Sequence, residues 1–168
     1  MPTTEQSPQM TWLIYALLTV GFWGVYGILL HSGIIALGPR SDPNARYKAF
    51  LFVGVAYFLT AVLAPLAILL IKGADWRFLS NGSAMTWSLL AGTAGAAGAF
   101  CVLLAFGARG TPAVVMSIIF AGAPIVNAVV AFLIHPPPGG LRAIQWPFVL
   151  GILLAAAGGM LVTLYKPT

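Results

Sequence analysis

The side chains that could do chemistry in this sequence are few and mostly neutral. Its 168 residues include three carboxylates, Glu5, Asp42 and Asp75, and all three fall outside the apolar stretches of the chain. Proton-coupled antiport of cationic drugs needs a carboxylate at membrane depth that binds proton and substrate in turn. The chain offers no carboxylate at that depth, so we exclude this mechanism.

Two histidines, His31 and His135, are the remaining titratable groups that could act as a base or a metal ligand. The span count given below places them at opposite membrane faces, about a bilayer thickness apart. They cannot share a metal within one subunit, and no nucleophile, base and acid can be assembled around either one. We therefore predict that both are interfacial, and we expect no metal site, no cofactor and no enzymatic activity.

A neutral polar residue, Asn127, needs hydrogen-bond partners in a dry interior, and it follows Pro124, which frees a backbone carbonyl on the preceding turn. Pro65 is expected to kink another helix in the same way. Two interpretations of Asn127 stay open, a bridge between two helices or a contact to a ligand. If the chain has a translocation pathway, its predicted lining is Trp23, Tyr26, Pro65, Pro124 and Asn127.

Five apolar stretches must position these side chains. Sixty per cent of the residues are apolar and 7% are charged, and about twenty apolar residues suffice for a helix to cross a bilayer. The composition therefore predicts an all-α integral membrane protein, a bundle of about five transmembrane helices. The expected helices cover residues 12–30, 49–71, 86–106, 113–134 and 147–165. They form a single membrane domain, 12–165, between a short polar tail, 1–11, and a C-terminal tail, 166–168.

The basic residues bear on partners and orientation. The net charge is +5, but the eight Lys and Arg are spread singly and form no stripe that would bind nucleic acid. Five of them flank the helix ends on the side of the C-terminus: Arg40, Arg46, Lys48, Arg109 and Lys166. The other three are Lys72, Arg77 and Arg142. This bias predicts an N-terminus outside and a C-terminus inside, with dual insertion still open, in a bacterial inner membrane.

Small residues recur at helical spacing and predict close helix packing, because lipid gives apolar helices no hydrophobic reason to associate. In the last expected helix, Gly151, Ala155, Gly158 and Gly159 form a smooth stripe along one side. This stripe is suited to contact either another helix of the same chain or a partner subunit.

With five helices expected, the sequence resembles one five-helix repeat of the EamA-type family in the drug/metabolite transporter superfamily. The resemblance lies in Trp23-Gly24 in the first helix, Pro124 in AGAPIVNAVVAFLI, and Gln145 followed by Gly151 and Gly158. One departure stands out. Repeats of this family commonly carry a glutamate after the fourth helix, where this sequence has His135.

The resemblance implies half of a ten-helix transporter, because typical members hold two such repeats in opposite orientation. One repeat can complete itself as an antiparallel homodimer or pair with another membrane subunit, with the Gly151 to Gly158 stripe as the contact. Two functions follow from this. One is a permease half that acts as a dimer on a small neutral or zwitterionic metabolite. The other is a non-catalytic structural or accessory subunit of a larger membrane protein complex.

Overall fold

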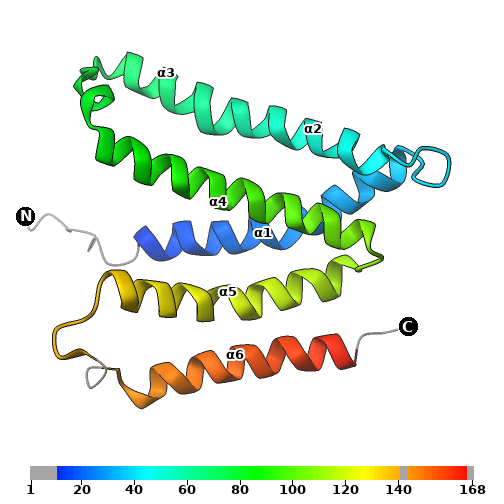
Figure 1. The fold of residues 1–168 in the computed structure, drawn as a ribbon. Helices are drawn as coiled ribbons and strands as arrows, with labels where there is room; N and C mark the ends of the chain where they lie inside the picture. The colour runs from blue at the N-terminus through cyan, green and yellow to red at the C-terminus, as the bar shows by residue number, and fades with distance from the viewer. Residues whose placement is uncertain (1–10, 141–143, 166–168) are drawn as a thin grey trace, which may run out of the picture. The chain divides into compact units, whose positions relative to one another are not determined.

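The computed structural model describes residues 11–140 and 144–165, and the regular structure of these residues is entirely helical (Figure 1). Five helices are long and apolar enough to cross a membrane, with mean hydropathies of 2.0 to 2.4 in their most apolar windows. They cover Thr11–Ala36, Ala45–Ile71, Gly82–Gly107, Pro112–Ile134 and Trp146–Leu164. The prediction of an all-α chain with five membrane-length helices is therefore confirmed.

The first helix, α1 (Thr11–Ala36), runs past the predicted end at residue 30. Two residues after its end, Gly38 adopts a left-handed conformation with φ of 68°. A Cβ at this position would also meet Ser41 Oγ at 2.9 Å, so glycine suits the turn on both counts. His31, one residue beyond the predicted end of this helix, thus lies within α1.

The second membrane-length helix is built from three segments: α2 (Ala45–Tyr57), the π-helical η2 (Phe58–Leu63) and α3 (Ala64–Ile71). Pro65 lies at the start of α3 and has no N–H to donate to the preceding turn. The chain accommodates it with a π-turn, in which the Ala64 N–H donates to the Leu59 carbonyl, five residues back. The interruption expected at Pro65 therefore takes the form of a wide turn in a helix that continues through it.

A short 3₁₀ turn, η3 (Arg77–Ser80), leads into α4 (Gly82–Gly107). Asn81 is the N-cap of α4, and its side-chain oxygen accepts the Ala84 N–H at 3.1 Å. The Asn81-Gly82 pair, which has the composition of a turn, thus starts a helix.

The chain divides into two compact units, 1–108 and 109–168. In the first unit α1, α2 and α4 contact one another, and the buried side chains come from the second half of α1, the start of α2 and the second half of α4. These buried residues are Leu30, Ile34, Ala45, Ala49, Ala99, Val102, Leu103 and Phe106. Among the described residues α3 packs on no other helix of the unit, and Figure 1 shows it well apart from the start of α1. The helices of the first unit therefore pack together where α1 and α4 end and α2 begins, and they separate toward α3 and the start of α1.

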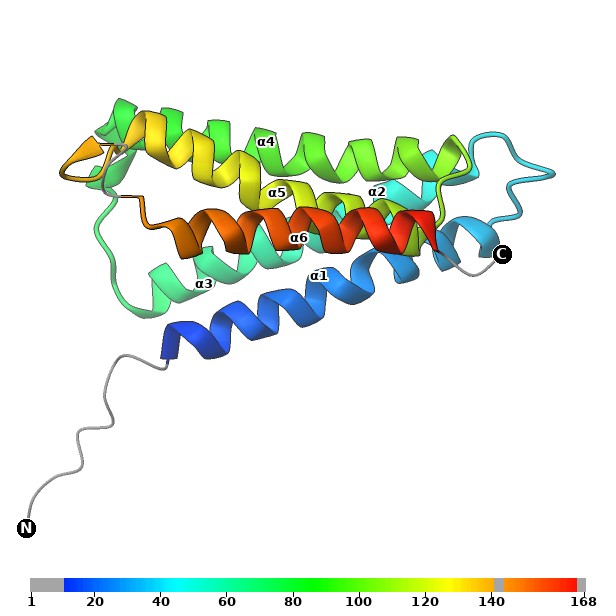
Figure 2. The same ribbon diagram turned by 90° about the horizontal axis from the view of Figure 1, so that it is seen from below.

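The second unit is a helical hairpin of α5 (Pro112–Ile134) and α6 (Trp146–Leu164), which lie side by side in Figures 1 and 2. Part of the connector is a tight turn in which the Gly140 N–H donates to the Pro137 carbonyl at 2.9 Å. Gly140 has a φ of 62°, which favours glycine. The single membrane domain expected over 12–165 stays a prediction.

Two helix-pair grooves as candidate binding sites

A groove of about 510 Å³ runs between α1 and α2, and its wall is almost entirely apolar. Tyr26 is the one lining residue with a polar side chain, and the ring of Trp23 lies 5.5 Å from the Tyr26 ring at 52°. The two side chains are three residues apart on α1, which brings them to neighbouring positions on the helix surface.

The Tyr26 hydroxyl is buried and has no hydrogen-bond partner within the described part of the chain. A buried polar group without a partner costs about 1–3 kcal/mol. Other atoms of the chain cover its oxygen, so a molecule in the groove would contact the Tyr26 ring and not the hydroxyl.

A larger groove of about 870 Å³ lies between α5 and α6. The predicted pathway residues Pro124 and Asn127 both line it, and they share it with His135 at the end of α5 and Gln145 just before α6. Its volume falls within the roughly 300–1,000 Å³ of ordinary ligand sites. Among the described residues, its polar lining side chains are those of Asn127, His135 and Gln145.

Sequence reasoning named Asn127 for this surface but did not place His135 or Gln145 beside it. His135 directly follows α5 and Gln145 directly precedes α6, and the closing of the α5–α6 hairpin brings them to one end of the groove. A polar residue on each side of a short interhelical loop is the signal that points to such a pair. Such residues can be assigned to one groove only when the relative position of the two helices is known.

The structure thus brings together two pairs of the predicted pathway residues, Trp23 with Tyr26 and Pro124 with Asn127, one pair in each unit. Pro65 lines neither of the two grooves. That these five residues line one translocation pathway stays a prediction.

The small-residue stripe of α6 is divided between two faces. Gly159 packs on α5, where a Cβ would collide with the Ala121 side chain and approach the Ser117 carbonyl oxygen at 3.1 Å. By contrast, a Cβ at Gly151 or Gly158 would meet no atom within 4 Å, and Ala155 is exposed. Only one member of the stripe is therefore used inside the hairpin.

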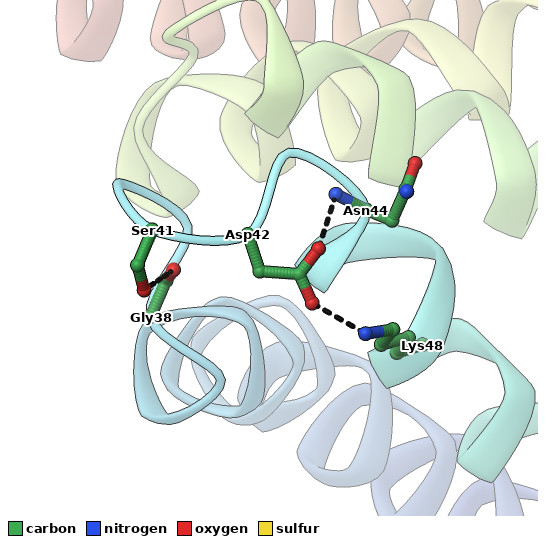
Figure 3. Close-up of polar contacts among 5 residues, drawn as sticks. All are labelled: Gly38, Ser41, Asp42, Asn44 and Lys48. Carbon is green, nitrogen blue, oxygen red and sulfur yellow. Dashed lines mark hydrogen bonds and ion pairs between the residues drawn. The ribbon is translucent and has the colours of Figure 1, made fainter.

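The connector between α1 and α2 holds the best-defined polar contacts of the described residues (Figure 3). Lys48 Nζ donates to Asp42 Oδ2 at 2.6 Å, and the Asn44 N–H donates to Asp42 Oδ1 at 2.9 Å. The hydrogen bond from Lys48, followed by that from Asn44, lowers the pKa of Asp42 below its ordinary value. These contacts shape the turn and the start of α2, and they include no group poised for catalysis.

Arg46 and His31 lie at the packed end of the first unit. The Arg46 guanidinium lies 4.8 Å from the centre of the Tyr47 ring, donates to the Tyr47 hydroxyl at 3.1 Å, and contacts Gly107 at the end of α4. A cation at a helix C-terminus offsets the partial negative charge of the last carbonyls. The His31 ring meets Phe106 edge-on at 5.5 Å. Arg46 thus connects α2 to α4, and His31 connects α1 to α4.

Among residues 11–140 and 144–165 no group of three or more His, Cys, Asp and Glu lies close enough to hold a metal ion. Comparison of the chain with protein-family models, with curated proteins and with solved structures gave no match. The resemblance to EamA-type repeats therefore stays a prediction, and the function has to be argued from the grooves.

Proposed function

We propose that this chain is a permease half that acts as a dimer and carries a small neutral or zwitterionic metabolite across a membrane. In this proposal the membrane is the bacterial inner membrane, the N-terminus lies outside and the C-terminus inside, and the protein has no catalytic role and no cofactor. One observation carries the proposal: Asn127, a carboxamide well inside a membrane-length helix, lines the α5–α6 groove.

The Asn127 amide destabilises the protein unless it forms hydrogen bonds with another group. It lies seven residues, or about 10 Å, before the end of α5, where lipid offers no hydrogen bonds. No side-chain hydrogen bond joins Asn127 to another residue of the described ranges. An unsatisfied amide at that depth costs several kcal/mol, so a polar group of a ligand in the groove would stabilise it.

The charge of the groove walls supports a neutral or zwitterionic ligand. Among residues 11–140 and 144–165, no Asp, Glu, Lys or Arg lines either groove, so a ligand with a net charge gains no counter-charge from these residues. The apolar walls, together with the amide of Asn127 in the α5–α6 groove, suit a molecule held by a few hydrogen bonds.

A structural or accessory subunit is the second candidate, and a specific observation favours it. Gly151 and Gly158 leave a smooth face of α6 that nothing within the hairpin covers. Replacement of Gly158 by Leu should reduce the mass of the detergent-solubilised particle if this face binds another subunit. Recovery of the wild-type chain in fixed proportion with a larger membrane complex would favour this candidate over the carrier.

Transport itself is tested with the purified chain in proteoliposomes loaded with a mixture of neutral and zwitterionic metabolites. Mass spectrometry of the contents over time should show selective loss of one or a few compounds, compared with protein-free liposomes. Asn127→Leu should abolish the loss, because leucine keeps the size of the side chain and removes its hydrogen bonds. Val126→Leu is the matched control, since Val126 is exposed on α5 and does not line the groove.

Selective efflux that is retained by Val126→Leu and lost in Asn127→Leu would support the carrier. Equal retention of every compound in protein-containing and protein-free liposomes would contradict it.

A further inference from the structure

The polar side chains of the α5–α6 groove lie at two depths. Asn127 lies on α5, eight residues before His135, the C-cap of this helix, and this spacing corresponds to about 12 Å along the helix axis. Gln145 lines the same groove from the other side of the connector. The groove therefore offers hydrogen bonds at its mouth, from His135 and Gln145, and again deep in the membrane, from Asn127.

The wall between these two depths is apolar and partly aromatic. Ala131 and Phe132 contribute from α5, and Phe148 contributes from α6. Aromatic side chains pack favourably against the flat face or the edge of another ring. A ligand that fills this part of the groove gains contact area only if its middle is apolar.

From this arrangement we infer that the groove binds an elongated, uncharged molecule about 12 Å long, with a hydrogen-bonding group at each end and an apolar, aromatic body between them. One end bonds to His135 and Gln145 at the membrane surface, the body lies along Phe132 and Phe148, and the other end bonds to the Asn127 amide. A carboxamide both donates and accepts, so a hydroxyl or a carbonyl satisfies it.

This inference names a substrate class for the proposed carrier, and it rests on the proposed function for transport but not for binding. Ligands with one polar end leave either Asn127 or the mouth of the groove unpaired. Short ligands with two polar ends cannot reach both depths. Length and the presence of two polar ends are thus the properties that the groove selects.

The test uses the full chain in phosphatidylcholine nanodiscs and fluorescence titration with 4,4′-dihydroxystilbene. The two comparison probes are 4-hydroxystilbene, which lacks one polar end, and hydroquinone, which is too short. Titration of empty nanodiscs corrects for partition into lipid. We expect saturable binding of dihydroxystilbene that is roughly tenfold tighter than that of monohydroxystilbene, as the loss of one buried hydrogen bond predicts, and no competition by hydroquinone.

In Asn127→Leu this preference should fall to less than about threefold, whereas Val126→Leu should keep it. If Asn127→Leu does not fold, as judged by its helical circular dichroism, Gln145→Leu tests the other end of the groove by the same criterion. Equal binding of the two stilbenes to the wild-type chain, or an unchanged preference in the folded variant, would overturn the inference.

The two proposals can fail separately. Binding of dihydroxystilbene without selective efflux of any metabolite from liposomes would retain the site and contradict the carrier. Efflux that depends on Asn127, without binding of dihydroxystilbene, would retain the carrier and contradict the substrate class.

Discussion

Asp42 is the carboxylate whose surroundings are best defined, and they give it a pH dependence of known sign. The hydrogen bond from Lys48 lowers its pKa in the folded chain. A carboxyl with a depressed pKa contributes stability above its unfolded pKa of about 3.9, and this contribution is lost as the pH falls through the folded value. The turn between α1 and α2 should therefore loosen only in strong acid.

The pKa of Asp42 can be measured from the carbon-13 shift of its carboxyl group between pH 2 and 7. We expect a midpoint below about 3.9, because the lysine ammonium stabilises the charged form. Lys48→Met should move the midpoint up toward that value. A wild-type midpoint at or above 3.9 would contradict the contacts described for Asp42.

Gly107 allows the Arg46 side chain to lie against the end of α4, because a Cβ there would collide with the guanidinium. Gly107→Ala should displace the guanidinium, the mobile end of the Arg46 side chain, from the Tyr47 hydroxyl and lower the free energy of unfolding by less than about 1 kcal/mol. Thermal unfolding in detergent measures the effect. Gly98→Ala, on the same helix with no atom within 4 Å of the new Cβ, is the control and should be neutral or stabilising.

At the scale of helices, length and apolar composition predicted all five membrane-length helices because these quantities alone decide whether a segment can cross a bilayer. The helix ends were harder to predict. The extension of α1 to Ala36 depends on the left-handed Gly38, and the start of α4 depends on the Asn81 cap. Helix ends of this kind depend on backbone conformation and on single hydrogen bonds, which a hydropathy profile does not detect.

The candidate site was predictable where its residues share one helix. Trp23 with Tyr26, and Pro124 with Asn127, are each three residues apart, and this spacing places side chains together on a helix surface. The addition of His135 and Gln145 to the Asn127 groove depends on how α5 and α6 face each other. The division of the small-residue stripe depends on the same facing, which the sequence of one helix does not contain.

Two adjacent glycines test which side of α6 packs on α5. Gly159→Ala should destabilise the hairpin by about 1–3 kcal/mol, because its Cβ collides with Ala121 on α5. Gly158→Ala should change stability by less than about 0.5 kcal/mol or increase it, since its Cβ meets no atom within 4 Å. Thermal unfolding of the two variants in the same detergent compares them directly. A greater loss of stability in Gly158→Ala than in Gly159→Ala would mean that α6 faces α5 differently.

At the scale of the whole molecule, the proposals depend on five helices that cross the membrane in succession. Large apolar side chains are exposed along all five, including Phe22 at 71%, Leu51 at 71% and Leu133 at 74%. Exposed apolar surface of this extent is compatible with hydrocarbon and not with water. Each interhelical connector must then lie on the opposite membrane face from the next.

The direct measurement is the labelling of single cysteines with a membrane-impermeant maleimide in a chain whose native Cys101 is replaced by serine. Ser41→Cys and Ala108→Cys probe the first and third connectors, and Ser80→Cys and Pro138→Cys probe the second and fourth. With five spans and an outside N-terminus, Ser80→Cys and Pro138→Cys should react in intact spheroplasts, and Ser41→Cys and Ala108→Cys only after lysis. Reaction of Ser41→Cys and Ser80→Cys from the same side would contradict the five-span membrane protein described above.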